Sequence, residues 1–226
     1  MALLGAAAMM LWYDIVPDQI AEHDDWHTRE HFPERVAIPG FMRAQRWVSE
    51  SGGPRYFVVY EVSDIDVLSS APYLDRLDNP TAWTRRLMPH FRGMARGFMS
   101  VRSRHGQVLG ATALSVRFAV TAGQDRRLRD GLDHELIPAA LQTRGVTSAF
   151  VLQSERTPEM TAEQSIRGRD AGVDGVLFVT GYSCEALKEL SSTTLTSTTL
   201  EAHGGSPQVH SGVYKLACLA DSIAKP

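Results

Sequence analysis

Apolar and polar residues change their spacing several times along the chain, and these changes mark a series of strands and helices. In the first half, alternating or continuous apolar runs predict strands over 11–16, 42–50, 55–63 and 92–103. Charged, helix-forming composition predicts helices over 18–38, 67–78 and 81–91. Pro39 and Gly40 form a typical helix stop, and Pro33 should kink the first helix or divide it in two.

The second half repeats the order strand, helix, strand, strand, helix, strand. Its strands are predicted over 114–120, 146–155, 173–182 and 208–219, and its helices over 124–143 and 184–203. A polar insertion, 156–172, stands where the first half has a tight hairpin turn at 51–54. Several residues recur at a constant offset of 105: Glu30 and Glu135, Pro33 and Pro138, Gly40 and Gly145. Such internal repetition predicts a duplicated structural unit.

Each half has the element order of a ferredoxin-like βαββαβ unit, a four-stranded antiparallel sheet with helices on one face. The uncovered face of each sheet would be a large apolar surface. One chain buries both surfaces if the two sheets face each other. We therefore predict an α+β protein of two tandem ferredoxin-like repeats, 1–108 and 109–226, whose antiparallel sheets form an α+β barrel, with the pocket in the first repeat.

Composition restricts the class of partner. The 226 residues include 43% hydrophobic and 22% charged residues, with a formal net charge of -3, so no basic field favours nucleic acid or a membrane. Cys184 and Cys218 are not spaced like zinc ligands, and free thiols are favoured over a disulfide. The apolar N-terminal run lacks a basic start and passes directly into a strand, so we expect a cytoplasmic protein without a signal peptide.

One long segment resembles a known superfamily. WHTREHFPERVAIPGFMRAQRWVS, followed after a Gly-Gly-Pro turn by RYFVVYEV, is similar to the dimeric α+β barrel superfamily, especially its EthD-like branch. There, a helix carrying a Trp and a His leads through a proline into Pro-Gly-Phe and a strand. The resemblance covers about 11–104, and in the second half only the element order supports it. It implies the barrel fold and is compatible with cofactor-free monooxygenases, isomerases, cyclases, haem-binding enzymes and proteins without a known activity.

Three histidines, His23, His27 and His31, recur every four residues in the first predicted helix. At 100° per residue they fall within an arc of about 80° that also holds Ile20 and Ile38, so the stripe should face protein. His23 and His31 would lie about 12 Å apart along the axis, too far for one metal ion to be held by all three. We therefore predict no metal site and acid–base chemistry by His31 or His27, with His23 contacting substrate. A simpler interpretation places only His31 inward.

The strand over 42–50 carries the candidate anion clamp. Strand alternation places Arg43 and Trp47 on one face and Arg46 on the other, so one arginine should face a core or pocket surface. A guanidinium there would bind a carboxylate, although an edge-strand arginine in water is an equal alternative. The second repeat replaces three candidate residues at the offset of 105: Leu136 for His31, Ser148 for Arg43 and Val151 for Arg46.

Aromatic residues complete the candidate site. Tyr60 is a possible acid or carbonyl-orienting group, and His90 is a second acid–base candidate in a proline-bounded segment near the pocket mouth. Trp26, Trp47 and Trp83 would wall a flat ligand. Packing alone is the simpler interpretation for the tyrosine and the tryptophans.

These residues favour a cofactor-independent isomerase or lyase that moves protons on a small anionic or aromatic-derived catabolic intermediate. We expect no cofactor, a carboxylate-bearing small-molecule substrate and a homodimer. Three alternatives remain open. A cofactor-free monooxygenase would use the same pocket with oxygen, a haem-binding member would need a histidine free to ligate iron, and a non-catalytic protein would bind a small ligand without turnover.

Overall fold

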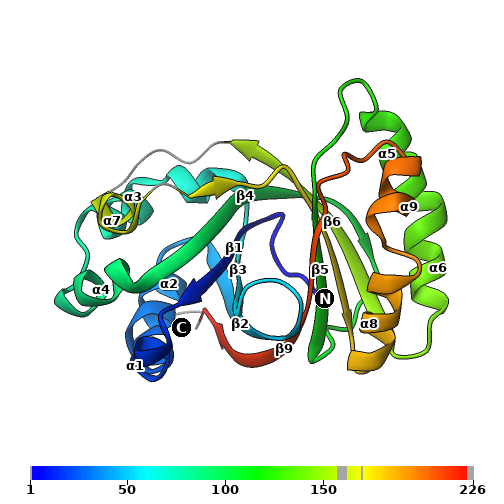
Figure 1. The fold of residues 1–226 in the computed structure, drawn as a ribbon. Helices are drawn as coiled ribbons and strands as arrows, with labels where there is room; N and C mark the ends of the chain where they lie inside the picture. The colour runs from blue at the N-terminus through cyan, green and yellow to red at the C-terminus, as the bar shows by residue number, and fades with distance from the viewer. Residues whose placement is uncertain (1, 157–161, 169, 223–226) are drawn as a thin grey trace.

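The computed structural model describes residues 2–156, 162–168 and 170–222 (Figure 1). Eight of the described strands close a barrel in the order β1-β3-β2-β9-β5-β8-β6-β4, because β4 also pairs with β1. The short β7 lies outside this ring and pairs in parallel with β4. The strands are β1 (Ala7–Ile15), β2 (Phe41–Ser51), β3 (Tyr56–Val62), β4 (Phe91–His105), β5 (Thr112–Phe118), β6 (Val146–Arg156), β7 (Ala171–Gly172), β8 (Gly175–Gly181) and β9 (His210–Asp221).

Each half of the barrel has the strand order of a ferredoxin-like sheet. The first repeat reads β4-β1-β3-β2 and the second β9-β5-β8-β6, so the fourth strand of each repeat lies beside its first. Antiparallel seams between β2 and β9 and between β4 and β6 join the two sheets. The predicted fold, two ferredoxin-like repeats forming an α+β barrel, is confirmed. The predicted boundary after residue 108 falls in the connection between β4 and β5 and stays a prediction.

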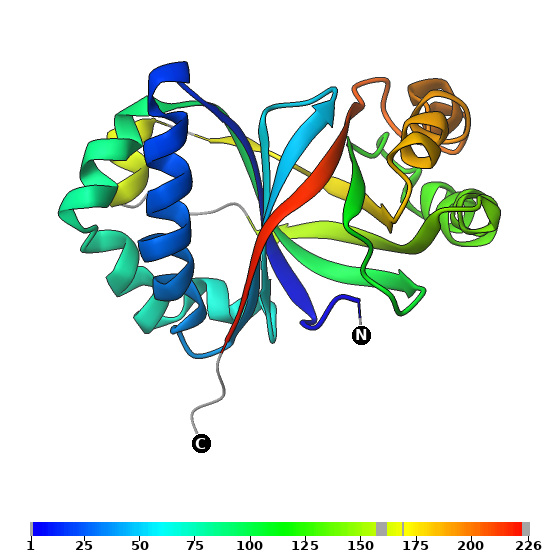
Figure 2. The same cartoon turned by 90° about the horizontal axis from the view of Figure 1, so that it is seen from below.

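Helices cover the two outer sides of the barrel (Figure 2). The first side carries η1 (Pro17–Gln19), α1 (Ile20–Trp26), η2 (His27–His31), α2 (Phe32–Val36), η3 (Ile65–Ser69), α3 (Ala71–Asp78), α4 (Ala82–Leu87) and η4 (Met88–His90). The second side carries α5 (Asp125–Gly131), η5 (Leu132–Leu136), α6 (Ile137–Gln142), α8 (Cys184–Ser192) and α9 (Ser197–Ala202). The remaining helix, α7 (Ala162–Arg167), belongs to the second repeat by sequence but packs against α3 and η4 of the first.

A π-helical turn precedes the proline in the first helix of each repeat. Pro33 has no N–H to donate to the carbonyl four residues back, and its ring would clash with that group in a regular α-helix. Instead, the Phe32 N–H bonds to the His27 carbonyl five residues back, which widens the helix at η2. The same turn, η5, precedes Pro138. The interruption predicted at Pro33 therefore takes the form of a π turn, and the helix continues beyond it.

Two predicted boundaries change for local reasons. The first strand begins at Ala7, because the apolar lead pairs with β3 and β4. The helix predicted over 67–78 is divided at Ser70, whose backbone is extended, and α3 restarts with Pro72 in its first turn, where a missing N–H costs nothing. Part of the predicted insertion, 157–161 and 169, lies outside the described residues.

Alternation along the strands produces three separate cores. One fills the space between the first-repeat helices and their sheet, one fills the barrel interior, and one lies under the second-repeat helices. In β1, Tyr13 belongs to the first core and its neighbour Trp12 to the barrel interior. Each strand of the first repeat therefore presents side chains to two different environments.

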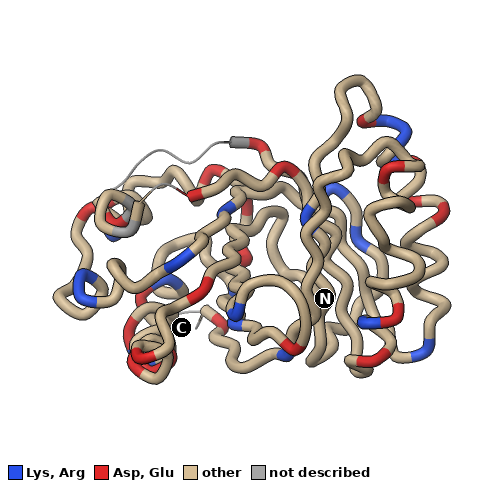
Figure 3. The backbone as a smooth tube through the Cα atoms, in the orientation of Figure 1, with Lys and Arg blue, Asp and Glu red and all other residues tan. Residues whose placement is uncertain are grey.

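Charge is spread over the surface, with basic and acidic segments interspersed along the tube (Figure 3). Cys184 and Cys218 are free thiols, each half-buried. Within the described ranges, no helix combines the length and the apolar character that crossing a bilayer would require.

Candidate functional site

A small cavity of about 30 Å³ lies between the helix α1–η2 and the sheet strands β1 and β3. Its polar lining consists of Tyr13, His27, His31, Tyr60 and Glu163, and the rest of its wall is apolar or aromatic. Such a volume holds about two water molecules. A ligand larger than this must therefore displace part of the cavity wall.

All three histidines of the stripe are buried against this sheet. His23, His27 and His31 are 0%, 2% and 7% exposed, so the interpretation that only His31 points inward is wrong. In an α-helix, four residues overshoot a full turn by about 40°, whereas in a π turn four residues fall short of one. The rotation about the helix axis that exceeds a full turn between His23 and His27 is thus offset by the π turn η2 between His27 and His31. The π turn keeps the stripe directed at the sheet.

The first polar array joins His23 to a carboxylate and a phenol. His23 Nδ1 lies 3.1 Å from Asp24 Oδ1, and His23 Nε2 lies 3.0 Å from the Tyr13 hydroxyl. Burial raises the pKa of Asp24, but hydrogen bonds from His23 and Tyr56 and the Arg46 charge outweigh it and leave that pKa below its usual value. An ionised carboxylate only accepts hydrogen bonds, so His23 Nδ1–H donates to it and Tyr13 O–H donates to Nε2.

Asp24 is held by further donors from the sheet. The Tyr56 hydroxyl donates to Oδ1 at 2.8 Å, and Arg46 Nη1 lies 3.3 Å from the same oxygen and 3.1 Å from the Asp24 carbonyl. Burial lowers the pKa of His23, and Asp24 only partly opposes that effect. His23 is therefore a neutral imidazole at neutral pH, with a fixed tautomer and a carboxylate positioned to stabilise its protonated form.

The second polar array lacks a carboxylate. His27 Nε2 lies 3.0 Å from the Tyr60 hydroxyl, while Nδ1 is buried without a hydrogen-bond partner among the described residues. The pKa of His27 lies well below its ordinary value, mainly because the ring is buried. Electrostatic repulsion from the neighbouring His23 and His31 lowers it further. Burial also raises the pKa of both Tyr13 and Tyr60 well above 10, so both phenols stay protonated. The two arrays thus place differently tuned imidazoles side by side, with ring centroids 5.1 Å apart.

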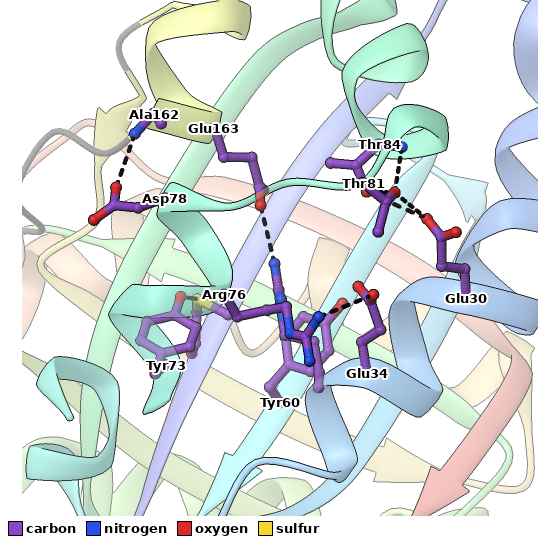
Figure 4. A network of polar contacts seen from close by, with 12 residues as sticks. Glu30, Glu34, Tyr60, Tyr73, Arg76, Asp78, Thr81, Thr84, Ala162 and Glu163 are labelled. Carbon is purple, nitrogen blue, oxygen red and sulfur yellow. Dashed lines mark hydrogen bonds and ion pairs between the residues drawn. The ribbon is translucent and has the colours of Figure 1, made fainter. Parts of the chain in front are cut away.

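His31 and Trp26 close the helix side of the cavity. Their ring centroids lie 4.3 Å apart, and His31 also approaches the Tyr60 ring at 6.2 Å. The Trp26 indole N–H is directed at Glu30 Oε1, 3.1 Å away, and at Thr84 Oγ1, 3.2 Å away. Figure 4 shows Glu30 facing Thr84 and its neighbouring threonine across the helix interface. This network fixes Trp26 as a rigid wall.

Helix α7 of the insertion covers the same region. Glu163 points from α7 toward the first-repeat helices (Figure 4). It forms an ion pair with Arg35, 3.0 Å between Oε2 and Nη2. Both side chains are less than a tenth exposed. Because Glu163 also lines the cavity, the second repeat contributes part of the wall of a site that the first repeat otherwise builds.

The structure brings together some of the sequence-predicted residues and separates others. His27, His31, Tyr60 and Trp26 line the cavity, and His23 lies behind it, in contact with the lining residue Tyr13. Arg46 lies beside it but is engaged by Asp24, so it is not a free anion clamp. The others lie outside the lining: Arg43 pairs with Asp221 at 2.7 Å, Trp47 is buried inside the barrel, Trp83 donates to Glu22 at 2.7 Å, and His90 is half-exposed in η4.

Sequence reasoning did not select several residues that the structure places here. Asp24 follows His23 directly in the sequence and Tyr13 lies on a neighbouring strand, but their contacts with His23 depend on β1 packing under α1, which local patterns do not fix. The Arg35–Glu163 pair spans 128 positions and connects the two repeats. Nothing in the local pattern around Glu163 predicts that contact.

The site geometry does not fit a metal ion or a haem. Among the described residues, no group of three or more His, Cys, Asp or Glu side chains converges as metal ligands do. The ring nitrogens His23 Nε2 and His27 Nε2 are taken by phenols, and a 30 Å³ cavity has no room for a macrocycle beside them.

Comparison with known proteins shows the fold of the chain. No family model matches it, and no curated protein matches it in sequence. An anthrone oxidase-like protein superposes with a TM-score of 0.68 at 12% identity, over 96% of this chain and 92% of that one. A proposed monooxygenase from Fusobacterium nucleatum subsp. nucleatum gives 0.61 at 9% identity over 97% and 96%. A point mutant of the chlorite dismutase from Candidatus Nitrospira defluvii superposes with a TM-score of 0.56 at 13% identity, over 94% of this chain and 92% of that one. The chain thus has the fold of single-chain α+β barrel proteins.

Proposed function

We propose that this protein is a cofactor-free oxygenase that deprotonates an electron-rich substrate and lets the resulting carbanion react with O2. The observation that carries the proposal is the buried array Asp24–His23–Tyr13, whose phenol lines the small cavity. It has the arrangement of a base held by a carboxylate, with the hydroxyl as the group in contact with substrate. The substrate needs a hydroxyl conjugated to the reacting carbon, as in the enol form of an anthrone.

The proposed steps balance without an external reductant. The substrate hydroxyl gives its proton to the Tyr13 oxygen as the Tyr13 proton moves to His23 Nε2. The enolate carbon then forms a bond to O2, and the substrate supplies all the electrons. The proton on His23 returns through Tyr13 to the distal oxygen of the peroxide. The hydroperoxide then loses water, which is formed from its distal OH and the one hydrogen that remains on the same carbon. The original CH2 thus becomes a carbonyl, and one O2 yields one carbonyl and one H2O.

The two histidines suit different roles because only one has a carboxylate. His23 can carry a proton, since Asp24 accepts a hydrogen bond from Nδ1 and offsets the charge. His27 has no such partner among the described residues and stays neutral, so we assign the Tyr60–His27 pair to hydrogen bonding with the enolate oxygen. When the surroundings of two groups of the same kind give them different pKa values, the two groups commonly take different acid–base roles.

The similar structures support oxygenase chemistry better than our first expectation of an isomerase or lyase. One is described as anthrone oxidase-like and another as a proposed monooxygenase. The resemblance of the first repeat to the EthD-like branch is compatible with the same activity. At such low sequence identity, the similarity to these proteins shows the fold alone. The reaction proposed for this chain therefore rests on the two polar arrays described above.

A substrate of the size of anthrone must widen this small cavity. Met88 and Met94 form part of its wall, and unbranched methionine side chains adapt readily to a new shape. The Tyr13, Tyr60 and Trp26 rings are fixed by hydrogen bonds and ring contacts, so we assign adaptation to the methionines. An aromatic substrate would then lie between Trp26 and the sheet.

The test is oxygen uptake by the purified protein with anthrone as probe, in the presence of a metal chelator. We expect uptake matched by quinone formation, a loss of about 100-fold in Tyr13→Phe, and unchanged uptake in His134→Gln. His134 is an exposed histidine on η5, the second repeat's counterpart of η2, and serves as the matched control. Product formation at equal rates without oxygen would indicate an isomerase or lyase instead. Full activity of Tyr13→Phe would refute the assigned base.

A further inference from the structure

A second cavity, larger than the first, lies at one end of the barrel. It measures about 220 Å³ and is lined by residues of β4, β5 and β7 and by the segment that enters β9. Its polar lining groups are Arg117, Asp174, Gln208 and His210. The function proposed above uses none of them. Trp12, on which Arg117 stacks, faces the barrel interior, whereas its neighbour Tyr13 faces the histidines, so the two cavities lie on opposite faces of β1.

The guanidinium of Arg117 lies over the ring of one buried tryptophan, Trp12. Its guanidinium carbon lies 5.0 Å from the centroid of the Trp12 ring. Trp12 is the first-repeat counterpart of Arg117 at the offset of 105. The Trp12 indole N–H donates to Ser115 at 3.0 Å, and its ring stacks on Phe57 with centroids 5.1 Å apart and an interplanar angle of 11°. Stacking positions the guanidinium without using its N–H donors.

Those donors have no acceptor or carboxylate partner within the described chain. Three other arginines with buried side chains each have one: Arg35 with Glu163, Arg46 with Asp24 and Arg96 with Asp170. Arg117 is half-buried, and burial lowers the pKa of its guanidinium. A partly desolvated cation without a counter-ion is unfavourable, so a bound anion would stabilise it.

The neighbouring groups indicate which anion fits. His210 stands directly opposite Arg117 in the β5–β9 pairing, and Gln208 adds amide donors at the mouth. Asp174 is exposed at the same cavity and would repel a second negative charge. The remaining wall includes Ala95 and Val173, which offer contact to an apolar body.

We propose that this barrel-end cavity binds a small monocarboxylate with a compact apolar body. The carboxylate accepts paired hydrogen bonds from Arg117, as a planar guanidinium favours, and the body lies on the apolar wall. A dianion such as phosphate binds less well because of Asp174. The site is independent of the oxygenase assignment, since no residue is shared between them.

The experiment is a calorimetric titration of the full chain with benzoate, benzamide and inorganic phosphate. The Trp12 indole N–H resonance, assigned by its loss in Trp12→Phe, reports binding at this site. We expect saturable benzoate binding that shifts this resonance, with benzamide and phosphate at least 10-fold weaker. Arg117→Gln should weaken benzoate at least 10-fold, and Arg117→Lys by less, because a lysine keeps the charge but not the fork.

Two control variants separate this site from the rest of the molecule. Arg126→Gln removes an arginine whose side chain is 93% exposed, and Tyr13→Phe alters the histidine cavity; both should bind benzoate as the unmodified chain does. Unchanged affinity in Arg117→Gln, equal affinity for benzamide or phosphate, or no saturable binding of benzoate would each overturn the proposal. The ligand comparison uses the unmodified chain, so it remains decisive if a variant at Arg117 fails to fold.

Discussion

Burial of His27 makes a quantitative prediction about stability against pH. Its pKa lies well below the ordinary 6.5 because the ring is buried beside two other histidines and has no carboxylate partner among the described residues. Below pH 6.5 the unfolded chain binds a proton at this residue and the folded chain does not. The contribution of His27 to the unfolding free energy is therefore fully present above that pH and is lost as the pH falls.

The magnitude follows from proton linkage. Between about pH 7.5 and about pH 5.5, one histidine that stays neutral only in the folded state costs about 1.4 kcal/mol of unfolding free energy. The assay is urea denaturation at several pH values for the unmodified chain and for His27→Gln. Glutamine keeps a hydrogen-bonding group near Tyr60 but does not titrate, so the variant should lose about 1.4 kcal/mol less over this interval, whatever its absolute stability.

Comparison of slopes removes the contribution of all other titrating groups, which the two proteins share. His134→Gln is the control, because His134 is exposed, and its slope should match that of the unmodified chain. Equal slopes for His27→Gln and the unmodified chain would show that His27 is protonated in the folded state. The assignment of the Tyr60–His27 pair as a neutral hydrogen-bonding arm would then be wrong.

Three further predictions concern the elements that shape the site. Pro33→Ala restores the missing N–H and permits a regular α-helix, so we expect about 10-fold slower oxygen uptake, while Pro138→Ala, the matched change in the second repeat, has no such effect. Glu163→Gln leaves Arg35 buried without its counter-ion and should lower the unfolding free energy by about 3 kcal/mol in urea denaturation; a change under about 1 kcal/mol would mean that the pair is solvated. Tyr13→Phe should abolish the pH dependence of the remaining uptake near the His23 pKa, and an unaltered pH profile would disconnect His23 from the reaction.

The fold was predictable because both repeats carry the same local signals. Strand alternation placed Trp47 and Arg46 on opposite faces of β2, as the structure shows. The residue correspondence at an offset of 105 extends to Gly40 and Gly145, which both end a helix with positive φ, 92° and 105°. These signals depend on neighbouring residues alone, which is why the sequence carries them.

The site was predictable only in part, for physical reasons. A wheel at 100° per residue placed the three histidines in one arc and predicted that the stripe faces protein, but it cannot represent the π turn that directs His27 and His31 at the same sheet. The value of Arg46 as an anion clamp depended on whether another residue already used its charge, and Asp24 does. Glu163 reaches the site from a helix that is distant in sequence, which no local pattern predicts.

Anaerobic mixing of the protein with anthrone tests the central claim most directly, because it separates proton removal from the reaction with oxygen. The proposed mechanism predicts that the enolate absorbance appears without oxygen, persists, and decays to the quinone with one O2 consumed when oxygen is admitted. The same mixing with Tyr13→Phe should give little enolate. Failure of the unmodified chain to form the enolate, together with no oxygen uptake, would contradict a cofactor-free oxygenase based on the Asp24–His23–Tyr13 array.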